Sequence, residues 1–147
     1  WDGYTTERAN LLQVLEKHHH NTGANPLFLT GDIHTEWAHT LHAPNQAADA
    51  GPLGAELVCS SVSAPNVDEI LGIPPNNPLT PAAQQIIQAA NPHCRHVNLV
   101  HHGYSYVTIR REEAEMHWLR VSAIGDPQAP VSDKITLTWR KGQGFTS

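Results

Sequence analysis

The sequence has few cysteines, few aromatic residues, few basic residues and no long apolar run. Two cysteines in 147 residues cannot form the framework of a disulfide-rich domain. Nine lysines and arginines against 14 aspartates and glutamates give a formal net charge of −5, which predicts no nucleic-acid-binding patch. No apolar stretch reaches the roughly 18 residues that a membrane-spanning helix needs. The chain opens at Trp1 with no visible signal peptide, so we expect a segment of a longer protein.

What the chain does contain is enough apolar sequence for one domain, and an unusual number of histidines. Its residues are 39% apolar, and its 11 prolines and 10 glycines predict much irregular structure. We expect most of the 11 histidines to lie at the surface or to contact the ligands of a site, because one site takes only a few ligands. Cys59 and Cys94 could form one disulfide or remain two buried thiols, and the sequence leaves both alternatives open.

Local signals predict two helices. The first runs from Thr5-Thr6, which offers an N-cap, to about His18–His20, ahead of the stop signal Asn21-Thr22-Gly23. The second begins at Thr80-Pro81, with threonine as N-cap and proline in the first helical position, and ends before Pro92. Glu36–Ala38 is expected to begin a short helix or a turn.

The remaining pattern predicts strands separated by loops. The strands are expected over residues 27–30, 55–62, 96–100, 104–110, 116–122 and 135–140. In the last of these, Ile135, Leu137 and Trp139 alternate with polar residues, which is typical of a half-exposed antiparallel strand. Residues 42–53 and 64–79 are expected to be loops, and His102-Gly103 a hairpin turn. This order predicts a layered α/β (α+β) fold with sheet packed between helices.

The strand at Leu27–Thr30 leads into the motif Gly31-Asp32-Ile33-His34. In an extended backbone, Asp32 and His34 would point to the same side, and ligand sites collect at the carboxyl ends of strands. A carboxylate suits hard cations and an imidazole suits transition metals, so the pair predicts part of a metal site. The alternative is that Asp32 caps the next turn and His34 fills a polar corner.

Several short motifs follow one another in an order that is typical of one enzyme family. They are Trp1-Asp2-Gly3-Tyr4 with Arg8, Leu29–His34 with Trp37 and Leu41, Glu56–Ser63, Asn91-Pro92-His93 and His102-Gly103-Tyr104. Each is weak alone. Together they resemble the alkaline phosphatase D family of the calcineurin-like metallophosphoesterase superfamily.

The resemblance implies an αββα sandwich, with a mixed sheet and antiparallel strands, of which residues 1–147 are the C-terminal segment. It implies a secreted or periplasmic phosphatase and phosphodiesterase that hydrolyses small phosphate esters with a metal-activated water. The implied cofactor is a two-metal centre of iron(III) and calcium, with Asp32 as a calcium ligand and His34 as an iron ligand.

The family's other metal ligands lie upstream of the matching motifs, and neither Cys59 nor Cys94 stands where its iron-binding cysteine is expected. The metal centre is therefore expected to be incomplete in this chain. Because the loss of ligands weakens metal binding steeply, we expect this segment alone to be inactive.

Asn91 and His93 form a polar turn after the second predicted helix and are candidate substrate-binding residues. The local alternative is that Asn91 ends the helix and His93 bonds to nearby backbone. Two other functions remain open. One is a non-catalytic binding or structural module on the same scaffold, and the other is a histidine-rich metal-binding protein, suggested by His18–His20 and His101-His102.

Overall fold

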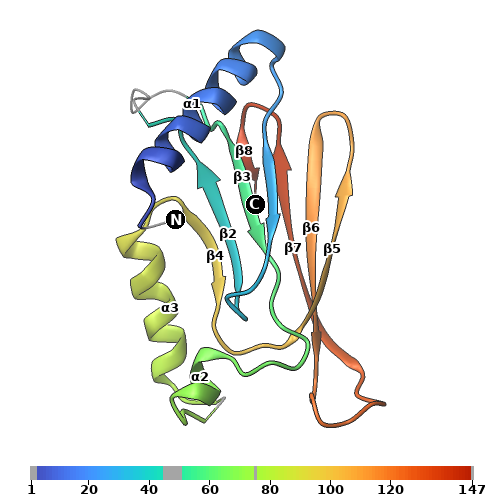
Figure 1. Ribbon diagram of the computed structural model, residues 1–147. Helices are drawn as coiled ribbons and strands as arrows, with labels where there is room; N and C mark the ends of the chain where they lie inside the picture. Colours follow the sequence, from blue (N-terminus) through green and yellow to red (C-terminus); the bar gives the residue numbers. More distant parts are fainter. Residues whose placement is uncertain (1–2, 45–50, 75, 147) are drawn as a thin grey trace.

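The computed structural model describes residues 3–44, 51–74 and 76–146, which form two β-sheets with helices beside them (Figure 1). In chain order the elements are α1 (Thr5–Thr22), β1 (Leu27–Thr30), β2 (Glu36–Leu41), β3 (Gly54–Val58), α2 (Val67–Ile70), α3 (Leu79–Ala90), β4 (Cys94–Asn98), β5 (Gly103–Ile109), β6 (Glu113–Val121), β7 (Val131–Arg140) and β8 (Gly144–Thr146). Trp1 and Asp2, which belong to the first family-like motif, lie outside the described residues. None of the described helices is long and apolar enough to cross a membrane.

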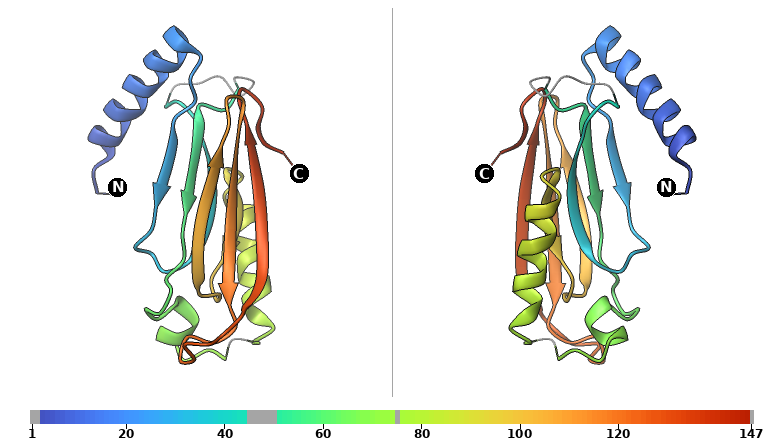
Figure 2. Two further views of the ribbon diagram at one scale, coloured as in Figure 1. Left: turned by 90° about the vertical axis from the view of Figure 1, so that its right-hand side faces the viewer. Right: turned by 90° about the vertical axis from the view of Figure 1, so that its left-hand side faces the viewer.

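The first sheet, sheet A, is mixed and has the strand order β1-β3-β2-β4. Strands β1 and β3 are parallel, and β2 is antiparallel to both β3 and β4, so β1, β3 and β4 run in one direction. Helix α1 lies on the face of sheet A that is turned away from the second sheet, and α3 runs beside β4 (Figures 1 and 2). Helix α1 ends at Gly23, whose φ of 68° is left-handed and whose N–H donates to the His19 carbonyl at 2.7 Å.

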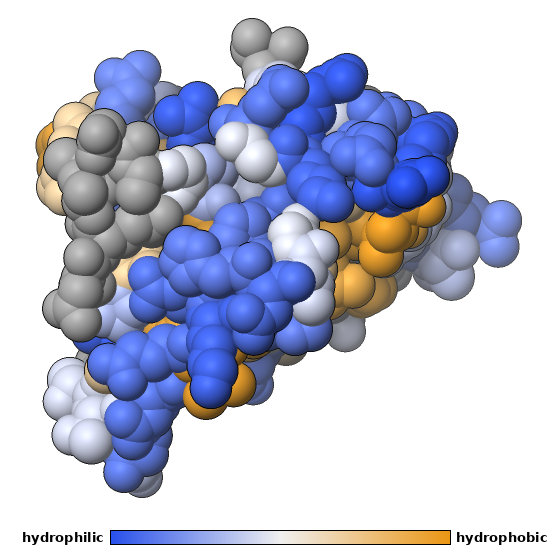
Figure 3. Space-filling view, turned by 90° about the horizontal axis from the view of Figure 1, so that it is seen from above, coloured by the Kyte–Doolittle hydropathy of each residue, from blue (hydrophilic) through white to orange (hydrophobic). Residues whose placement is uncertain are grey.

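The second sheet, sheet B, is antiparallel in the order β5-β6-β7-β8, and the core lies between the two sheets. Ala38 and Leu57 from sheet A pack with Met116 and Trp118 from sheet B. The Trp118 indole N–H donates to the Val58 carbonyl at 2.9 Å across this core. From the end at which β1, β3 and β4 begin, the surface is mostly hydrophilic, with apolar side chains visible in patches (Figure 3).

The predicted layered fold with a mixed sheet and antiparallel strands is confirmed. The alternation of Ile135, Leu137 and Trp139 is confirmed as well, because all three pack into the core from β7. The thiols of Cys59 and Cys94 are both free. Strand β8, three residues long, was not predicted, because so short a segment carries no period that a pattern can reveal.

Three local predictions were wrong for identifiable reasons. Glu36–Ala38 begins strand β2 instead of a helix or turn, and its charged Glu36 faces the core, which hides the apolar pattern. Helix α3 starts at Leu79, one residue before Thr80, because the Asn77 side-chain oxygen accepts the Leu79 N–H at 2.9 Å. His102-Gly103 is no hairpin turn; it carries the chain from sheet A to sheet B.

Gly103 is required at this crossing by close packing. A Cβ atom at this position would overlap the Leu119 carbonyl oxygen of the neighbouring strand β6. The glycine in the family-like motif His102-Gly103-Tyr104 therefore has a packing role, and it lets β5 pair closely with β6.

Candidate functional site

Three loops meet at one end of sheet A. Because β1, β3 and β4 run in the same direction, their carboxyl ends lie together, at the lower end of the sheet in Figure 1. The loops that follow these strands are residues 31–35, 59–66 and 99–102, and we call this region the carboxyl edge. Open α/β sheets bind their ligands preferentially at such an edge.

Side-chain hydrogen bonds hold the three loops of the carboxyl edge together. The Ser60 hydroxyl lies 2.6 Å from the His101 carbonyl oxygen and 3.3 Å from that of His34. The Asn66 amide donates to the Val100 carbonyl at 2.6 Å. The loop that carries Asp32 and His34 is thereby attached to two other segments, which gives it a defined position.

Asp32 and His34 have an unusual backbone conformation. Strand β1 ends at Thr30, and the two residues have φ values of 75° and 58°, in the left-handed region. Because the backbone is not extended here, the alternation of side chains along a strand does not apply. The reason that the sequence analysis gave for expecting the two side chains to point to the same side was therefore wrong. Non-glycine residues are uncommon in this region, and such strain is concentrated at functional sites.

The His34 ring is oriented by a backbone acceptor. Its Nδ1 lies 2.9 Å from the Pro65 carbonyl oxygen. A carbonyl can only accept a hydrogen bond, so Nδ1 carries the ring proton and Nε2 of the neutral ring keeps its lone pair. Histidine ligands of metals are commonly held by such a contact of the second ring nitrogen. The His34 ring therefore suits a metal ligand that binds through Nε2.

Asp32 and His34 offer one oxygen donor and one nitrogen donor at the carboxyl edge, with the Asp32 side chain exposed. This donor pair fits part of a two-metal site, since carboxylate and imidazole suit different cations. Within the described ranges, no group of three or more histidine, cysteine, aspartate or glutamate side chains is arranged to hold a metal ion. The described part of the chain thus supplies at most some of the ligands of such a centre.

A buried ion pair lies behind the same edge, at the start of β2. Glu36 is 1% exposed and accepts two hydrogen bonds from the Arg120 guanidinium, at 3.1 and 2.7 Å. His96 Nε2 lies 3.1 Å from the same carboxylate. Burial alone raises the pKa of the Glu36 carboxyl, but the hydrogen bonds from His96 and Arg120 outweigh burial and leave the pKa lowered.

This ion pair was missed in the sequence analysis. Arg120 lies on the same inward face of β6 as Ala114, Met116 and Trp118. A charged residue at such a core position was the signal that the sequence offered. Its partner Glu36 is 84 residues away in the sequence, and no local pattern connects the two.

The structure does not bring Asn91 and His93 to the carboxyl edge. Both precede β4, at the opposite end of the strand from Asn98. The Asn91 amide donates to the Ile87 carbonyl at 2.9 Å, and the His93 ring lies 5.4 Å from the His39 ring between centroids. Asn91 thus has a local role at the helix end and His93 contacts strand β2, so a substrate contact of either residue stays a prediction without support from this geometry.

The two histidine clusters also have local partners. In α1, His19 Nδ1 lies 2.8 Å from the Ala24 carbonyl oxygen just past the helix. At the carboxyl edge, His102 Nε2 lies 3.0 Å from the Glu69 carboxylate, and His101 Nδ1 lies 3.0 Å from the Asn98 side-chain oxygen. One ring nitrogen of each of these three histidines therefore has a hydrogen-bond partner.

Comparisons with known proteins agree on one family. A model of the PhoD-like phosphatases matches residues 1–118. Alkaline phosphatase D from Bacillus subtilis (strain 168) is 25% identical over 143 residues, which is 97% of this chain and 22% of that protein. A solved structure of PhoD superimposes with a TM-score of 0.73 at 22% identity, over 99% of this chain and 26% of that chain. The chain thus spans about a quarter of the length of these relatives.

Proposed function

Because this chain belongs to the PhoD-like phosphatase family, we propose that it is a segment of a metal-dependent hydrolase of phosphate mono- and diesters. The observation that carries the proposal is the His34 ring, whose Nδ1 is held by the Pro65 carbonyl while Nε2 of the neutral ring keeps its lone pair, two residues after Asp32. The position at the carboxyl ends of β1, β3 and β4 supports it further.

In this proposal Asp32 is a calcium ligand and His34 is a ligand of iron(III). The assignment follows ligand preference, because calcium takes oxygen donors and iron accepts imidazole nitrogen. A metal pair, when bound, lowers the pKa of a water and offsets the charge that develops on the phosphoryl group. The remaining ligands have to come from outside the described residues.

Residues of this chain orient the His34 side chain and the loop that carries it. The Pro65 carbonyl selects the His34 tautomer, and the Ser60 hydroxyl bonds to loop carbonyls on either side. These contacts fix a donor atom before a ligand arrives, which lowers the entropy that binding costs. Small phosphate esters as substrates, and a location outside the cytoplasm, belong to the same proposal and are supported by the family resemblance.

A chimera tests the proposal. This chain would replace the corresponding segment of alkaline phosphatase D from Bacillus subtilis (strain 168), and hydrolysis of a chromogenic phosphodiester would be measured with calcium present. We expect Asp32→Asn and His34→Gln each to lower the rate by about 100-fold or more and to reduce the bound metal. Ile33→Val, at an exposed position between them, should keep the rate. The chain by itself is expected to hydrolyse nothing.

Each outcome of this experiment separates the proposal from its alternative. Full activity and full metal content in the Asp32→Asn, His34→Gln double variant would remove both residues from the site. A folded chimera that binds substrate but never hydrolyses it would favour the non-catalytic binding module on the same scaffold. Metal measurements report on the ligands even where the rate is low.

A further inference from the structure

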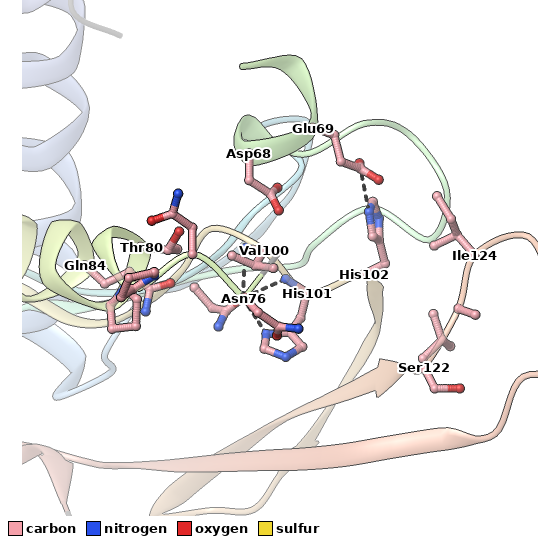
Figure 4. Close-up of a pocket in the computed structure, with 16 residues that line it drawn as sticks. Asp68, Glu69, Asn76, Thr80, Gln84, Val100, His101, His102, Ser122 and Ile124 are labelled. Atoms are coloured by element: carbon pink, nitrogen blue, oxygen red, sulfur yellow. Dashed lines mark hydrogen bonds and ion pairs between the residues drawn. The ribbon is translucent and has the colours of Figure 1, made fainter. Parts of the chain in front are cut away.

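A cavity lies against the 99–102 loop of the carboxyl edge. It has a volume of about 820 Å³, within the usual range of small-molecule sites, and it opens between α2, α3, residues 98–102 and residues 121–124 (Figure 4). We call it the α2–α3 cavity. Asp32 and His34 do not line it. The cavity thus borders the carboxyl edge through residues 100–102 without containing the proposed metal ligands, and the inference below goes beyond the proposed phosphatase activity.

Asp68 is the unusual side chain of this cavity. It is 4% exposed, it belongs to α2, and its carboxylate points into the cavity (Figure 4). Its Oδ1 atom has no hydrogen-bond partner among the described residues. A buried carboxylate oxygen without a partner is costly in free energy, so this oxygen calls for a hydrogen-bond donor, above all a positively charged one.

His102 provides a second buried polar atom in the cavity wall that has no partner among the described residues. Its Nε2 lies 3.0 Å from the Glu69 carboxylate, which also accepts the Asn66 N–H at 2.8 Å. The Asn66 N–H and the contact with His102 outweigh desolvation and leave the Glu69 pKa lowered, so this carboxylate is an acceptor. Nε2 therefore carries a proton, and the buried Nδ1, which has no described partner, accepts a hydrogen bond when the ring is neutral.

The cavity is unsuited to an anion. Among the described residues that line it there are two carboxylates, Asp68 and Glu69, but no lysine or arginine. Helix α3 begins at its wall, yet the first helical N–H groups are already used. Those of Leu79 and Thr80 bond to Asn77, and Pro81 has none. The permanent charges of the described lining are therefore negative, which disfavours a phosphate here.

We propose that the α2–α3 cavity binds a small organic molecule that carries a primary ammonium group. The ammonium donates to the Asp68 carboxylate, and a further donor of the same molecule bonds to His102 Nδ1. A divalent metal ion fits less well, since the described residues form no group of three metal-competent side chains here. Charge and donors together define the ligand class.

Titration of the chain with three small probes tests the proposal. Ethanolamine has an ammonium and a hydroxyl group, choline keeps the charge but has no N–H donor, and ethylene glycol has donors but no charge. Backbone amide shifts in NMR spectra would be followed for residues 68, 69, 100–102 and 121–124. We expect ethanolamine to bind more tightly than either other probe, and Asp68→Asn to weaken its binding about tenfold or more.

A matched control variant and a titration with calcium chloride complete the test. Asp32→Asn removes an exposed carboxylate outside the cavity, and it should leave ethanolamine binding unchanged even though it affects the proposed metal site. Failure of the phosphatase proposal would thus leave this result intact. The proposal would be overturned by equal shifts with ethylene glycol or choline, by calcium chloride shifting the same amides instead, or by no shift at all, which leaves water as the occupant.

Discussion

Asp32 and His34 keep a left-handed backbone, at φ values of 75° and 58°, within one short loop. Most side chains lose roughly 1–2 kcal/mol in this conformation. Glycine is favoured at such positions, and aspartate and histidine are among the other residues that adopt them most often, so two metal-competent residues in this conformation agree with a functional loop. The strain should therefore be measurable by substitution.

We expect Asp32→Gly to raise the free energy of unfolding by about 0.5–1 kcal/mol. Glycine adopts this φ without steric cost, and its larger chain entropy offsets only part of the gain. Ile33→Gly is the matched control. Ile33 is exposed and does not have a positive φ, so the same replacement should cost about 0.5–1 kcal/mol. Urea unfolding measures both, and an equal loss in the two variants would show that Asp32 stores no strain.

The Glu36–Arg120 ion pair connects the start of β2 in sheet A to β6 in sheet B. Both partners are buried, at 1% and 6% exposure. Removing one partner of such a pair leaves an uncompensated charge in the core, whereas removing both together is far less damaging. Glu36 follows His34 by two residues, so its pairing with Arg120 also holds the C-terminal end of the 31–35 loop at the carboxyl edge.

Arg120→Met should lower the free energy of unfolding by about 3–5 kcal/mol, because among the described residues the Glu36 carboxylate then keeps only His96 as a partner. The double variant Glu36→Met, Arg120→Met should lose less than the single one. Arg110→Met is the surface control: Arg110 pairs with Glu115 at 2.7 Å but is about half exposed, and water screens such pairs. If Arg110→Met were as damaging as Arg120→Met, burial would not be the cause.

The molecule as a whole depends on contact between two sheets of different kinds. Trp118 occupies the centre of this contact: it is fully buried, packs on Ala38 and Leu57 of sheet A, and donates to the Val58 carbonyl at 2.9 Å. Sheet A carries the carboxyl edge, and sheet B adds the 121–124 segment that borders the α2–α3 cavity. Both proposed sites thus depend on how the two sheets pack against each other.

Trp118→Ala is expected to cost about 3–5 kcal/mol of unfolding free energy, from lost burial and the cavity it leaves. Trp118→Phe should cost less, about 1–3 kcal/mol, because it mainly leaves the Val58 carbonyl without its donor. Tyr104→Ala, on the neighbouring strand but 45% exposed, should change stability least. Chemical denaturation with tryptophan-independent detection, such as far-UV circular dichroism, would contradict this order if Tyr104→Ala were the most harmful.

Part of the carboxyl edge could be read from sequence, and part could not. The end of β1 before Gly31 follows from an apolar run and a glycine, so Asp32 and His34 were correctly placed at a strand end. Their backbone was not foreseen, since a left-handed φ at aspartate or histidine has no sequence pattern. Asn91 and His93 were placed near the site by motif order alone, and the direction of β4 puts them at its other end.

The sequence by itself determined the features that act within a few residues: the left-handed Gly23 that ends α1, the alternation in β7, and the motifs that mark the family. The tertiary structure alone decided that Glu36 is buried against Arg120, that Pro65 orients His34, and that Asp68 and His102 face one cavity. The physical reason is the distance along the sequence over which each interaction acts. Backbone preferences and side-chain period are local, whereas charge pairing and acceptor placement depend on segments brought together only by the packed sheets.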